Sequence, residues 1–549
     1  MKDDGKADMT APQAAPLPAE TEVLIVGAGP VGLALALELR SHGVAVLLID
    51  QGDGAVDHPR TNTVGPRAME HFRRWGLADR IRAAGWPADH SLDTAWVTRI
   101  GGHEVHRLHV GSTVTRAPFR HTPEPEAICP QHWLTPLLAG ALGHHPDGPL
   151  RLRCRFDGLR QDREGVTVDL VDLAAGRTVS VRARHLVGAD GADSAVRAAC
   201  GVPAPGRHPG QLLRNILFEA PGLRERLGNR HALFYFLLLS DALRFPMRAV
   251  DGQDLYRLSI RCGGTPEATQ PAPALLRRAI AFDDLPLRVR SDQHWQLTHR
   301  VAEEFRCGRV LLVGDAAHTL SPSGGFGCDA GIAAAANLGW KLAAELAGWA
   351  GPGLLDSYQE ERRPVAVTAL DEAHRNLRRT MDRELPADLH QDSSLGRATR
   401  AAFAARLEAD GARREFDAPM IHMGYRYDSR IVLPAPPADG EPLDRPNALP
   451  GSRAPHAWLA PGRSTLDLFG PDHHLLAFGG ADPLPLRAAF AARGIPLTTT
   501  RCADPEVAAL YRAPLVLVRP DGHVAWRGEG GEGGQGGDAD RVARVVRGS

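Results

Sequence analysis

The sequence predicts an α/β fold: a Rossmann-like nucleotide-binding domain with an inserted antiparallel sheet, followed by a small C-terminal α/β domain. Three observations support this. A buried-strand pattern at 23–26 leads into Gly27-Ala28-Gly29-Pro30-Val31-Gly32 and a helix pattern. A second glycine-rich stretch follows another apolar strand pattern at 310–313. Between these two stretches, strand-like segments at 211–262 favour a mostly antiparallel sheet.

The first element is a βαβ unit at residues 22–50, with strands at 23–26 and 46–50 and a helix from 30 to 40. Gly27 permits the turn, Gly29 lets the backbone approach a pyrophosphate, and Gly32 permits close packing of the helix. Asp50 ends the second strand, 18 positions after Gly32, where an acidic residue accepts hydrogen bonds from ribose hydroxyls. Pro30, Val31 and Gln51 complete the predicted nucleotide contacts of this unit.

A helix is predicted next at 66–76, then a hairpin across Gly101-Gly102, then a helix from about 131 to 142. A phosphate at a helix N-terminus favours a positive neighbour, and Arg60 or Arg67 would supply it. Gln131 would either hydrogen-bond the dinucleotide or cap its own helix.

Strand patterns at 150–187 lead into Gly188-Ala189-Asp190-Gly191-Ala192-Asp193-Ser194-Ala195-Val196-Arg197. After the strands of 211–262, the buried strand at 310–313 delivers Gly314-Asp315, then Ser321-Pro322-Ser323-Gly324-Gly325-Phe326-Gly327 and a helix. Such a site suits a flat ligand with hydroxyls for Asp315 and developing negative charge for the helix N-terminus. A flavin meets both demands.

Helices are expected to continue from 338 to about 376 with a kink or break at Pro364, before a proline-rich linker at 433–450. The final segment alternates strand and helix patterns. The expected organisation is a leader at 1–20 without stable structure; a nucleotide-binding domain at 21–200 and 290–380; a substrate-binding sheet at 201–289 with parts of 90–125; a helical segment and linker at 381–450; a small α/β domain at 451–530; and a flexible tail at 531–549.

Composition narrows the function. The 64 basic and 65 acidic residues nearly cancel, which gives no electrostatic footprint for nucleic acid or an anionic membrane. The apolar run at 23–39 is interrupted by glycines and a proline, so it predicts a strand, a turn and a helix rather than a membrane span. Seven scattered cysteines without a CxxC pair favour reduced thiols in the cytoplasm and predict no metal site. His144-His145 and His473-His474 lack metal-ligand spacing and are expected at the surface.

Three ordered motifs, at 27–32, 188–197 and 314–327, together resemble the class A flavoprotein monooxygenases, the family of p-hydroxybenzoate hydroxylase, phenol hydroxylase and the aromatic polyketide hydroxylases. The resemblance covers approximately residues 20–380. It implies a GR2-type FAD-binding domain. More weakly, residues 451–526 resemble the thioredoxin-like C-terminal domain of the phenol hydroxylase branch, with Pro514 where thioredoxin folds place a cis-proline but no CxxC for redox chemistry.

The resemblance implies an extended FAD. Its adenosine end would lie at 27–32 and Asp50, its pyrophosphate near Arg60 or Gln131, its ribitol on Asp315, and its isoalloxazine along 322–328, which contains Pro322, Gly325, Gly327 and Cys328. Asp190 belongs to a second fingerprint linked with FAD and NAD(P)H. NAD(P)H would reduce the flavin, O2 would form a C4a-hydroperoxide, and an aromatic small molecule would be hydroxylated. A homodimer is a family expectation.

Two departures matter. Asp329 replaces the usual Asn and Ala334 the usual Asp. A carboxylate beside the flavin pyrimidine opposes anionic reduced flavin unless it is protonated or paired. Three readings therefore stay open: an aromatic hydroxylase, a Baeyer-Villiger or epoxidising relative, and a non-redox cyclase or scaffold with structural FAD.

The candidates for catalytic side chains are few, because the chemistry would be borne by the flavin. Asn62 stands where the phenol hydroxylase branch can place an aspartate. Strand alternation would aim some of the side chains on the inserted sheet at the crevice, namely Tyr235, Arg244, Tyr256 and Arg257. Pro322 is a further candidate, next to the ring. His318 is expected to pack or hydrogen-bond rather than act as a base.

Overall fold

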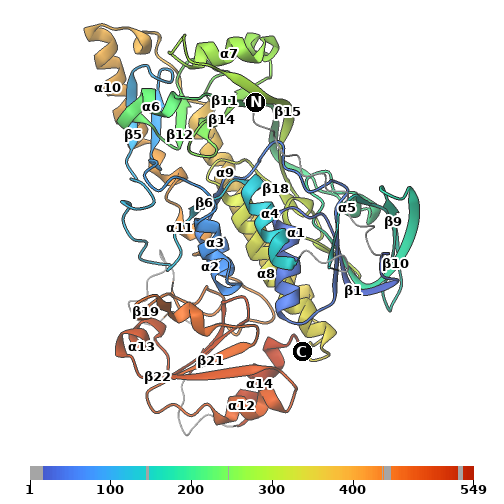
Figure 1. The fold of residues 1–549 in the computed structure, drawn as a ribbon. Helices are drawn as coiled ribbons and strands as arrows, with labels where there is room; N and C mark the ends of the chain where they lie inside the picture. The colour runs from blue at the N-terminus through green and yellow to red at the C-terminus, as the bar shows by residue number, and fades with distance from the viewer. Residues whose placement is uncertain (1–15, 144–147, 245, 436, 438–446, 529–535) are drawn as a thin grey trace, which may run out of the picture.

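The computed structural model describes residues 16–143, 148–244, 246–435, 437, 447–528 and 536–549. It shows the predicted mixed α/β fold, built around three main sheets (Figure 1). The first sheet has the strand order β16-β17-β10-β1-β2-β7, and β9 and β8 extend it from β10. Its strands are β1 (Glu20–Val26), β2 (Val46–Ile49), β7 (Leu150–Arg151), β8 (Cys154–Gln161), β9 (Val166–Asp172), β10 (Arg177–Gly188), β16 (Arg306–Cys307) and β17 (Val310–Leu312).

The centre of this sheet is parallel, and its strands β17, β10, β1 and β2 end side by side. In the register, Val26 pairs with Gly188 and with Ile49, and Gly188 pairs with Leu312. The three motifs of the sequence therefore begin at the same edge of one sheet. Ligands of open α/β sheets bind at this carboxyl edge.

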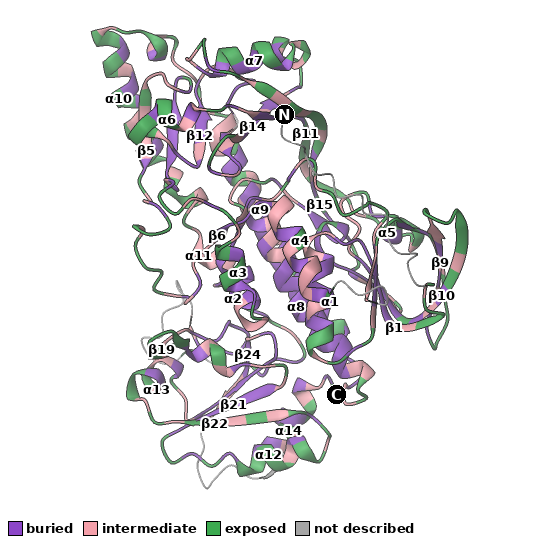
Figure 2. Cartoon of the chain, viewed as in Figure 1, coloured by how far each residue is buried: buried purple, intermediate pink, exposed green. Residues whose placement is uncertain are grey.

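Two helices start at that edge. Helix α1 (Pro30–Ser41) follows β1, and α8 (Phe326–Leu346) follows the last glycine-rich stretch. Figure 2 shows α8 buried along most of its length, because it packs between α1 and the later helix α9. At Gly339 of α8 an added Cβ would lie 2.4 Å from Cγ of Glu38 in α1, so the two helices approach closely.

The second sheet has the order β18-β15-β11-β14-β13-β12-β4-β5 and is antiparallel except between β12 and β4. It confirms the predicted hairpin around Gly101-Gly102. Helices α6 (Leu223–Leu227) and α7 (Ala272–Ala279) cover one face, over a core of its own. Its strands are β4 (Thr94–Val97), β5 (Glu104–Leu108), β11 (Gly206–Glu219), β12 (Phe234–Leu237), β13 (Pro246–Ala249), β14 (Leu255–Arg261), β15 (Arg288–Val301) and β18 (His318–Thr319).

The third sheet, at the bottom of Figure 1, has the order β22-β21-β23-β24. β21 pairs with β22 in parallel, whereas β21 with β23 and β23 with β24 are antiparallel. Along the chain its elements are β21 (His473–Phe478), α12 (Leu484–Ala491), β22 (Leu497–Cys502), α13 (Pro505–Tyr511), β23 (Leu515–Val518), β24 (Val524–Gly528) and α14 (Gly536–Val546).

The remaining elements connect these sheets. Helix α9 continues through Pro364. Of the predicted kink or break at this proline, a break in the helix is therefore wrong. The bounds of these connecting elements are β3 (Thr63–Val64), α2 (Pro66–Arg74), α3 (Ala78–Arg82), β6 (Ala127–Ile128), α4 (Gln131–Leu142), α5 (Ala195–Ala199), α9 (Asp356–Met381), α10 (Ser394–Ala409), α11 (Pro419–His422), β19 (Trp458–Ala460) and β20 (Arg463–Ser464), with short 3-10 turns that include η3 (Gly314–Ala316), η5 (Ala412–Glu415) and η6 (Thr465–Leu468).

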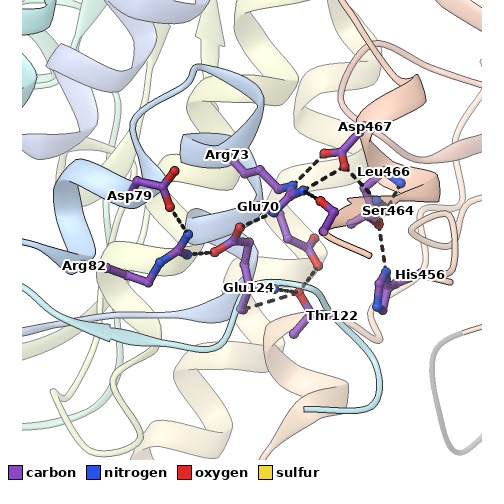
Figure 3. Close-up of polar contacts among 11 residues, drawn as sticks. Glu70, Arg73, Asp79, Arg82, Thr122, Glu124, His456, Ser464, Leu466 and Asp467 are labelled. Carbon is purple, nitrogen blue, oxygen red and sulfur yellow. Dashed lines mark hydrogen bonds and ion pairs between the residues drawn. The ribbon is translucent and has the colours of Figure 1, made fainter. Parts of the chain in front are cut away.

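Helix α2 is fastened to the C-terminal part of the chain by charged side chains (Figure 3). Nε of Arg73 donates to Asp467 over 2.6 Å, and Nη1 of Arg73 donates to the buried Glu124 over 2.8 Å. Asp467 also accepts from the backbone N–H of Ser464 at the start of η6. Nε of Arg453 donates to Glu70 of α2 over 2.8 Å. Residues of the 453–467 segment, which precedes the third sheet, are thus fixed against α2.

Several expectations need correction. His473 and His474 are buried, because β21 begins at His473 and lies between two neighbouring strands. The predicted flexible tail contains α14, whose Val542 and Val546 are buried against the third sheet; 531–535 lie outside the described residues.

Other expectations concern short segments. Within the described residues no peptide bond is cis, so the expectation of a cis-proline at Pro514 is wrong. Residues 1–15 of the leader, 438–446 of the linker, and His144-His145 lie outside the described residues. No helix in the described part of the chain combines the length and apolar character needed to cross a membrane.

Candidate functional site

The first and third glycine motifs meet at the carboxyl edge of the first sheet. An added Cβ on Gly314 would lie 3.1 Å from Cγ1 of Val31, and one on Gly331 would lie 2.6 Å from its Cγ2. The start of α1 is therefore wedged between η3 and α8. The second motif joins them, because an added Cβ on Gly27 would lie 2.4 Å from the carbonyl oxygen of Ala189.

The glycines divide into packed and open positions. Gly27 has φ +106°, and Gly32 lies so close to it that a Cβ would come within 1.9 Å of the Gly27 carbonyl oxygen. By contrast, a Cβ at Gly29 meets nothing within 4 Å, and the same holds at Gly325 and Gly327 at the start of α8. Space is thus left in front of two helix N-termini, where backbone N–H groups bind phosphates and other anions. This arrangement fits a dinucleotide.

Asp50 holds the first glycine turn. Its carboxylate accepts from the N–H of Ala28 over 2.7 Å and from that of Gly52 over 2.7 Å. Gln51, the next residue, is exposed at the end of β2. Pro30 is the first residue of α1 and is half-buried.

The two arginines that were candidates for binding the phosphate lie in different environments. Oε1 of Gln131 accepts from the N–H of Arg60 over 3.0 Å, so the structure brings these two predicted residues together, with Arg60 exposed. Arg67, in contrast, is buried and donates to Glu70 and to the carbonyl oxygen of Asp521. Arg67 therefore faces the C-terminal sheet, and the expectation that it serves a phosphate is wrong.

The second motif is tied to the third. Asp190 accepts from the hydroxyl of Ser194 over 2.6 Å and from the N–H of Val196 over 3.0 Å, so it fixes the start of α5. Arg197 of α5 donates to the carbonyl oxygen of Ala316 over 2.8 Å. This bond supports η3, which carries Asp315.

Asp315 stands on η3 with its side chain exposed. The surrounding protein still removes part of its water, which raises the pKa of this carboxyl, while Arg60 opposes the rise. Pro322 is also exposed, and Cys328 is half-buried in the first turn of α8. These residues lie on η3, on the last glycine-rich stretch and in the first turn of α8.

Asp329 is buried and paired. Its Oδ1 accepts from the N–H of Ala68 over 2.7 Å, and its Oδ2 lies 2.8 Å from Nδ1 of His422. Ala334 lies in the core of the first domain. The carboxylate of Asp329 is therefore paired with a residue 93 positions away in the sequence.

The second sheet presents aromatic side chains on the face opposite α6 and α7. Trp96 and Phe236 are cross-strand partners whose rings stack at 5.1 Å. Phe416, which follows η5, packs against both rings and against Phe234 at 5.9 Å. Although aromatic residues make up only 5% of the chain, four of them gather here.

Two arginines lie next to this aromatic group. Arg248 and Arg257 are direct partners on β13 and β14, and the guanidinium of Arg248 lies 4.7 Å from the ring of Phe234. Burial and the neighbouring Arg257 lower the pKa of Arg248, and burial lowers the pKa of Arg257 to about 10. Nη1 of Arg257 donates to the carbonyl oxygen of Pro59 over 2.7 Å. Among the described residues, no acidic side chain pairs with Arg248 or Arg257.

The proposed catalytic candidates lie at different places. Asn62 is buried against the second sheet, where its Nδ2 lies 3.4 Å from the carbonyl oxygen of Ala249 on β13. Tyr235 points into the core under α6 and α7, where its hydroxyl accepts from the N–H of Ala232 over 2.6 Å. Tyr235 therefore does not face the crevice. Arg244 pairs with Asp241 and donates to the carbonyl oxygen of Met381.

Glu415, at the end of η5, contacts the last glycine loop through the hydroxyl of Ser323 and the N–H of Gly324. Burial raises the pKa of Glu415 to about 7, against the opposing charge of Arg379. The buried ring of His318 is neutral, because burial lowers its pKa to about 4. No group of three or more metal-ligating side chains gathers within the described residues.

Comparisons with known proteins agree with this geometry. Residues 20–373 match the family model described as FAD binding domain, and residues 447–548 match that of the aromatic-ring hydroxylase C-terminal region. The site and fold thus define a flavoprotein monooxygenase. The chain belongs to the FAD-binding aromatic-ring hydroxylase family, and FAD is its cofactor.

Similar proteins include named monooxygenases. The tetracenomycin B2 monooxygenase-dioxygenase of Streptomyces olivaceus is 33% identical, with 93% of this chain and 95% of the relative aligned. The rebeccamycin biosynthetic enzyme RebC, solved with reduced flavin, is 56% identical with a TM-score of 0.92 over 97% of this chain and 100% of that one. Aklavinone-11 hydroxylase, solved with FAD and aklavinone, is 29% identical with a TM-score of 0.79 over 97% and 99%.

The sequence patterns did not predict four residues of the site: Arg248, Glu415, Phe416 and His422. The last three lie in the segment 412–422, which contains the two short helices η5 and α11 and no motif. For Arg248, the alternation of β13 offered a signal, because Met247 and Ala249 are buried on the other face.

Proposed function

We propose that this protein is an NAD(P)H-using, O2-dependent hydroxylase of a polycyclic aromatic natural product that carries an acidic group. One observation carries the substrate class: Arg248 and Arg257 lie side by side next to an aromatic group and lack an acidic partner among the described residues. Burying two adjacent positive charges is costly unless an anion compensates them. A carboxylate bound by both guanidinium groups would do so.

The names of similar proteins support the same class. RebC has been solved after soaking with chromopyrrolic acid, with 7-carboxy-K252c bound, and K252c-soaked RebC has also been solved. RebC is 56% identical to this chain. An acid of this kind would place its ring system against Trp96, Phe234, Phe236 and Phe416, which offer stacking surfaces.

The residues of the chain would perform positioning and exclusion of water. Gly29 and the start of α1 would take the pyrophosphate, Asp315 the ribitol hydroxyls, and Gly325 and Gly327 the ring. Bound FAD supplies the activation of O2 with electrons from NAD(P)H. The glycine-rich loop at 321–327 is called the flavin loop below. Phe416 would lie between this loop and the aromatic rings of the second sheet and would shield the reacting region from water.

Two alternatives use the same site. A Baeyer-Villiger or epoxidising reaction also inserts one oxygen atom and would differ only in the product. A non-redox role with structural FAD would be favoured if the charge of Asp329 had no partner. Asp329 is, however, paired with His422. This pairing favours the redox reading.

Domain roles are part of the proposal. The first sheet, in residues 21–200 and 290–380, would form the Rossmann-like FAD-binding domain, and the second sheet the inserted substrate-binding domain. The order β21-α12-β22-α13-β23-β24-α14 supports a thioredoxin-like C-terminal domain. Without a CxxC pair this domain would be structural, and a homodimer stays a prediction for size measurement in solution.

The test is anaerobic reduction of the purified FAD-bound protein by NADPH, with and without chromopyrrolic acid or K252c. Bleaching of the flavin, followed after admission of air by a product with one added oxygen, supports the hydroxylase. Product structure by NMR separates hydroxylation from Baeyer-Villiger insertion. A protein that keeps oxidised flavin under all these conditions, with NADH as well as NADPH, would sink the proposal and favour structural FAD.

A further inference from the structure

Asp329 joins the starts of two helices. It lies in the first turn of α8, yet its Oδ1 accepts from the N–H of Ala68 in the first turn of α2 over 2.7 Å. Helix α2 begins after Gly65, which has no side chain to cap it, and an added Cβ on Gly65 would lie 2.7 Å from the Asp329 carboxylate. Asp329 therefore supplies the missing cap of α2 from a neighbouring helix.

His422 holds the other oxygen of this carboxylate. It ends the short helix α11, and its ring lies 5.1 Å from that of Phe326 at the start of α8. Burial opposes its protonation, but the hydrogen bond and charge of Asp329 outweigh burial and raise the pKa of His422. His422 also reaches the backbone of Gly324 in the flavin loop. One ring thus connects α11, α8 and that loop.

Other charged groups around His422 are few. Glu126, which precedes β6, faces both His422 and Asp329, and burial raises the pKa of Glu126. Asp417 and Arg116 act on Glu126 from the surrounding loops. Among the described residues, Asp329 is the only carboxylate that forms an ion pair with His422.

We propose that His422 is a positioning residue: its imidazolium neutralises Asp329 and fixes the start of α8 and the Ser321–Gly327 loop in the form that accepts reduced, anionic FAD. The proposal rests on the proposed redox function. A neutral amide at position 329 would need no partner, whereas a carboxylate there repels the anionic ring unless a cation balances it. In this chain Asp329 and its partner His422 together keep the region neutral.

The test compares His422→Gln, Asp329→Asn and the double variant by the midpoint potential and dissociation constant of bound FAD. Gln keeps a donor but no charge, so His422→Gln should lower the potential and weaken binding of reduced FAD. The double variant, again neutral, should return toward the wild-type potential. A purely structural role predicts instead that the double variant is no better than His422→Gln, and that outcome overturns the proposal, as does an unchanged potential in His422→Gln.

The pH dependence adds a second readout. The wild-type potential should fall more steeply than that of the double variant as pH rises through the titration of His422, because only the wild type then loses the balancing charge. His109→Gln is a matched control: His109 also pairs with an aspartate, Asp93 at 3.4 Å, but its side chain is 80% exposed. Thermal unfolding of each apoprotein checks folding. These measurements need neither NAD(P)H nor substrate, so they stand even where hydroxylation is not found.

Discussion

Nη1 and Nη2 of Arg519 donate to the two carboxylate oxygens of Glu361 over 2.5 and 2.9 Å, with both side chains almost fully buried. Arg519 directly follows β23 of the C-terminal sheet, and Glu361 belongs to α9. Glu361 also accepts from Lys341 and Asn337 of α8, over 2.7 Å each, and from Ser429 over 2.7 Å. One carboxylate therefore connects the C-terminal sheet with the two long helices behind the FAD site.

We expect Glu361→Gln to destabilise the apoprotein by about 3 kcal/mol, because it leaves buried Lys341 without its negative partner and Arg519 with Asp521 alone. Burial opposes ionisation of Glu361, but Arg519 and Lys341 outweigh it and lower its pKa to about 2. Its contribution to stability is therefore complete above pH 4.5 and is lost as pH falls toward 2.

Urea unfolding at neutral and acidic pH measures both effects. The control is Glu360→Gln, one residue earlier on α9, where the carboxylate is partly exposed and pairs with Arg430 over 2.6 Å. That variant should lose less than about 1 kcal/mol. Equal losses in the two variants would contradict the role assigned to the buried cluster.

The glycines of the first motif give a contrast between folding and binding. Gly29→Ala should fold with nearly unchanged stability, since its Cβ meets nothing within 4 Å, but should weaken FAD binding by occupying the approach of the pyrophosphate. Gly32→Ala should destabilise the apoprotein by several kcal/mol, on the order of 3, because its Cβ would overlap the Gly27 carbonyl oxygen. Thermal unfolding measures the stability of both variants, and FAD titration measures their affinity for FAD. Tight FAD binding by Gly29→Ala would refute the assignment.

Arg248→Met should stabilise the apoprotein by about 1 kcal/mol, since it removes a half-buried charge without an acidic partner among the described residues and keeps the contact with Phe234. The same variant should raise the Kd for chromopyrrolic acid about tenfold or more, because a charge-assisted hydrogen bond contributes about 1.5–3 kcal/mol. Calorimetric titration measures the second effect. Arg290→Met, at an exposed ion pair with Glu219, is the control and should change neither quantity strongly.

The parts of the fold that could be predicted are those with short-range signals. The βαβ unit, the hairpin at Gly101-Gly102 and the helix from Gln131 each depend on neighbouring residues, and all three are present. The burial of His473 could not be predicted, because it depends on β21 lying between β22 and β23. Likewise, α14 is stabilised by packing on the third sheet rather than by its own sequence pattern.

The residues of the candidate site likewise include some that could be predicted from local sequence and some that could not. Glycines and Asp315 were predicted because their spacing reflects a local backbone requirement. The partner of Asp329 could not be predicted, since His422 lies 93 residues away at the end of the short helix α11, and a single histidine there carries no signal. Arg248 and Arg257 become a pair only through the register of β13 with β14.

Glu415 offers a final prediction, on pH. Its folded pKa of about 7 lies above the ordinary value of 4.5, so the folded state holds a proton that the unfolded state has lost between these values. Stability linked to Glu415 is therefore present below pH 4.5 and lost as pH rises toward 7. Glu415→Gln stays neutral. Between pH 5 and 8, its free energy of unfolding should therefore rise relative to that of the wild type by on the order of 1 kcal/mol.

Unfolding of the apoproteins in urea across this range measures the difference, and taking wild type minus variant removes the titration of other groups that Glu415 does not influence. Glu408→Gln serves as the control, because that side chain is 70% exposed and its stability difference from wild type should stay flat. A flat difference for Glu415→Gln as well would show that Glu415 is ionised in the folded protein at pH 5. The hydrogen bonds to Ser323 and Gly324 would then stabilise the carboxylate, and the flavin loop would be held by a charged residue throughout the physiological range.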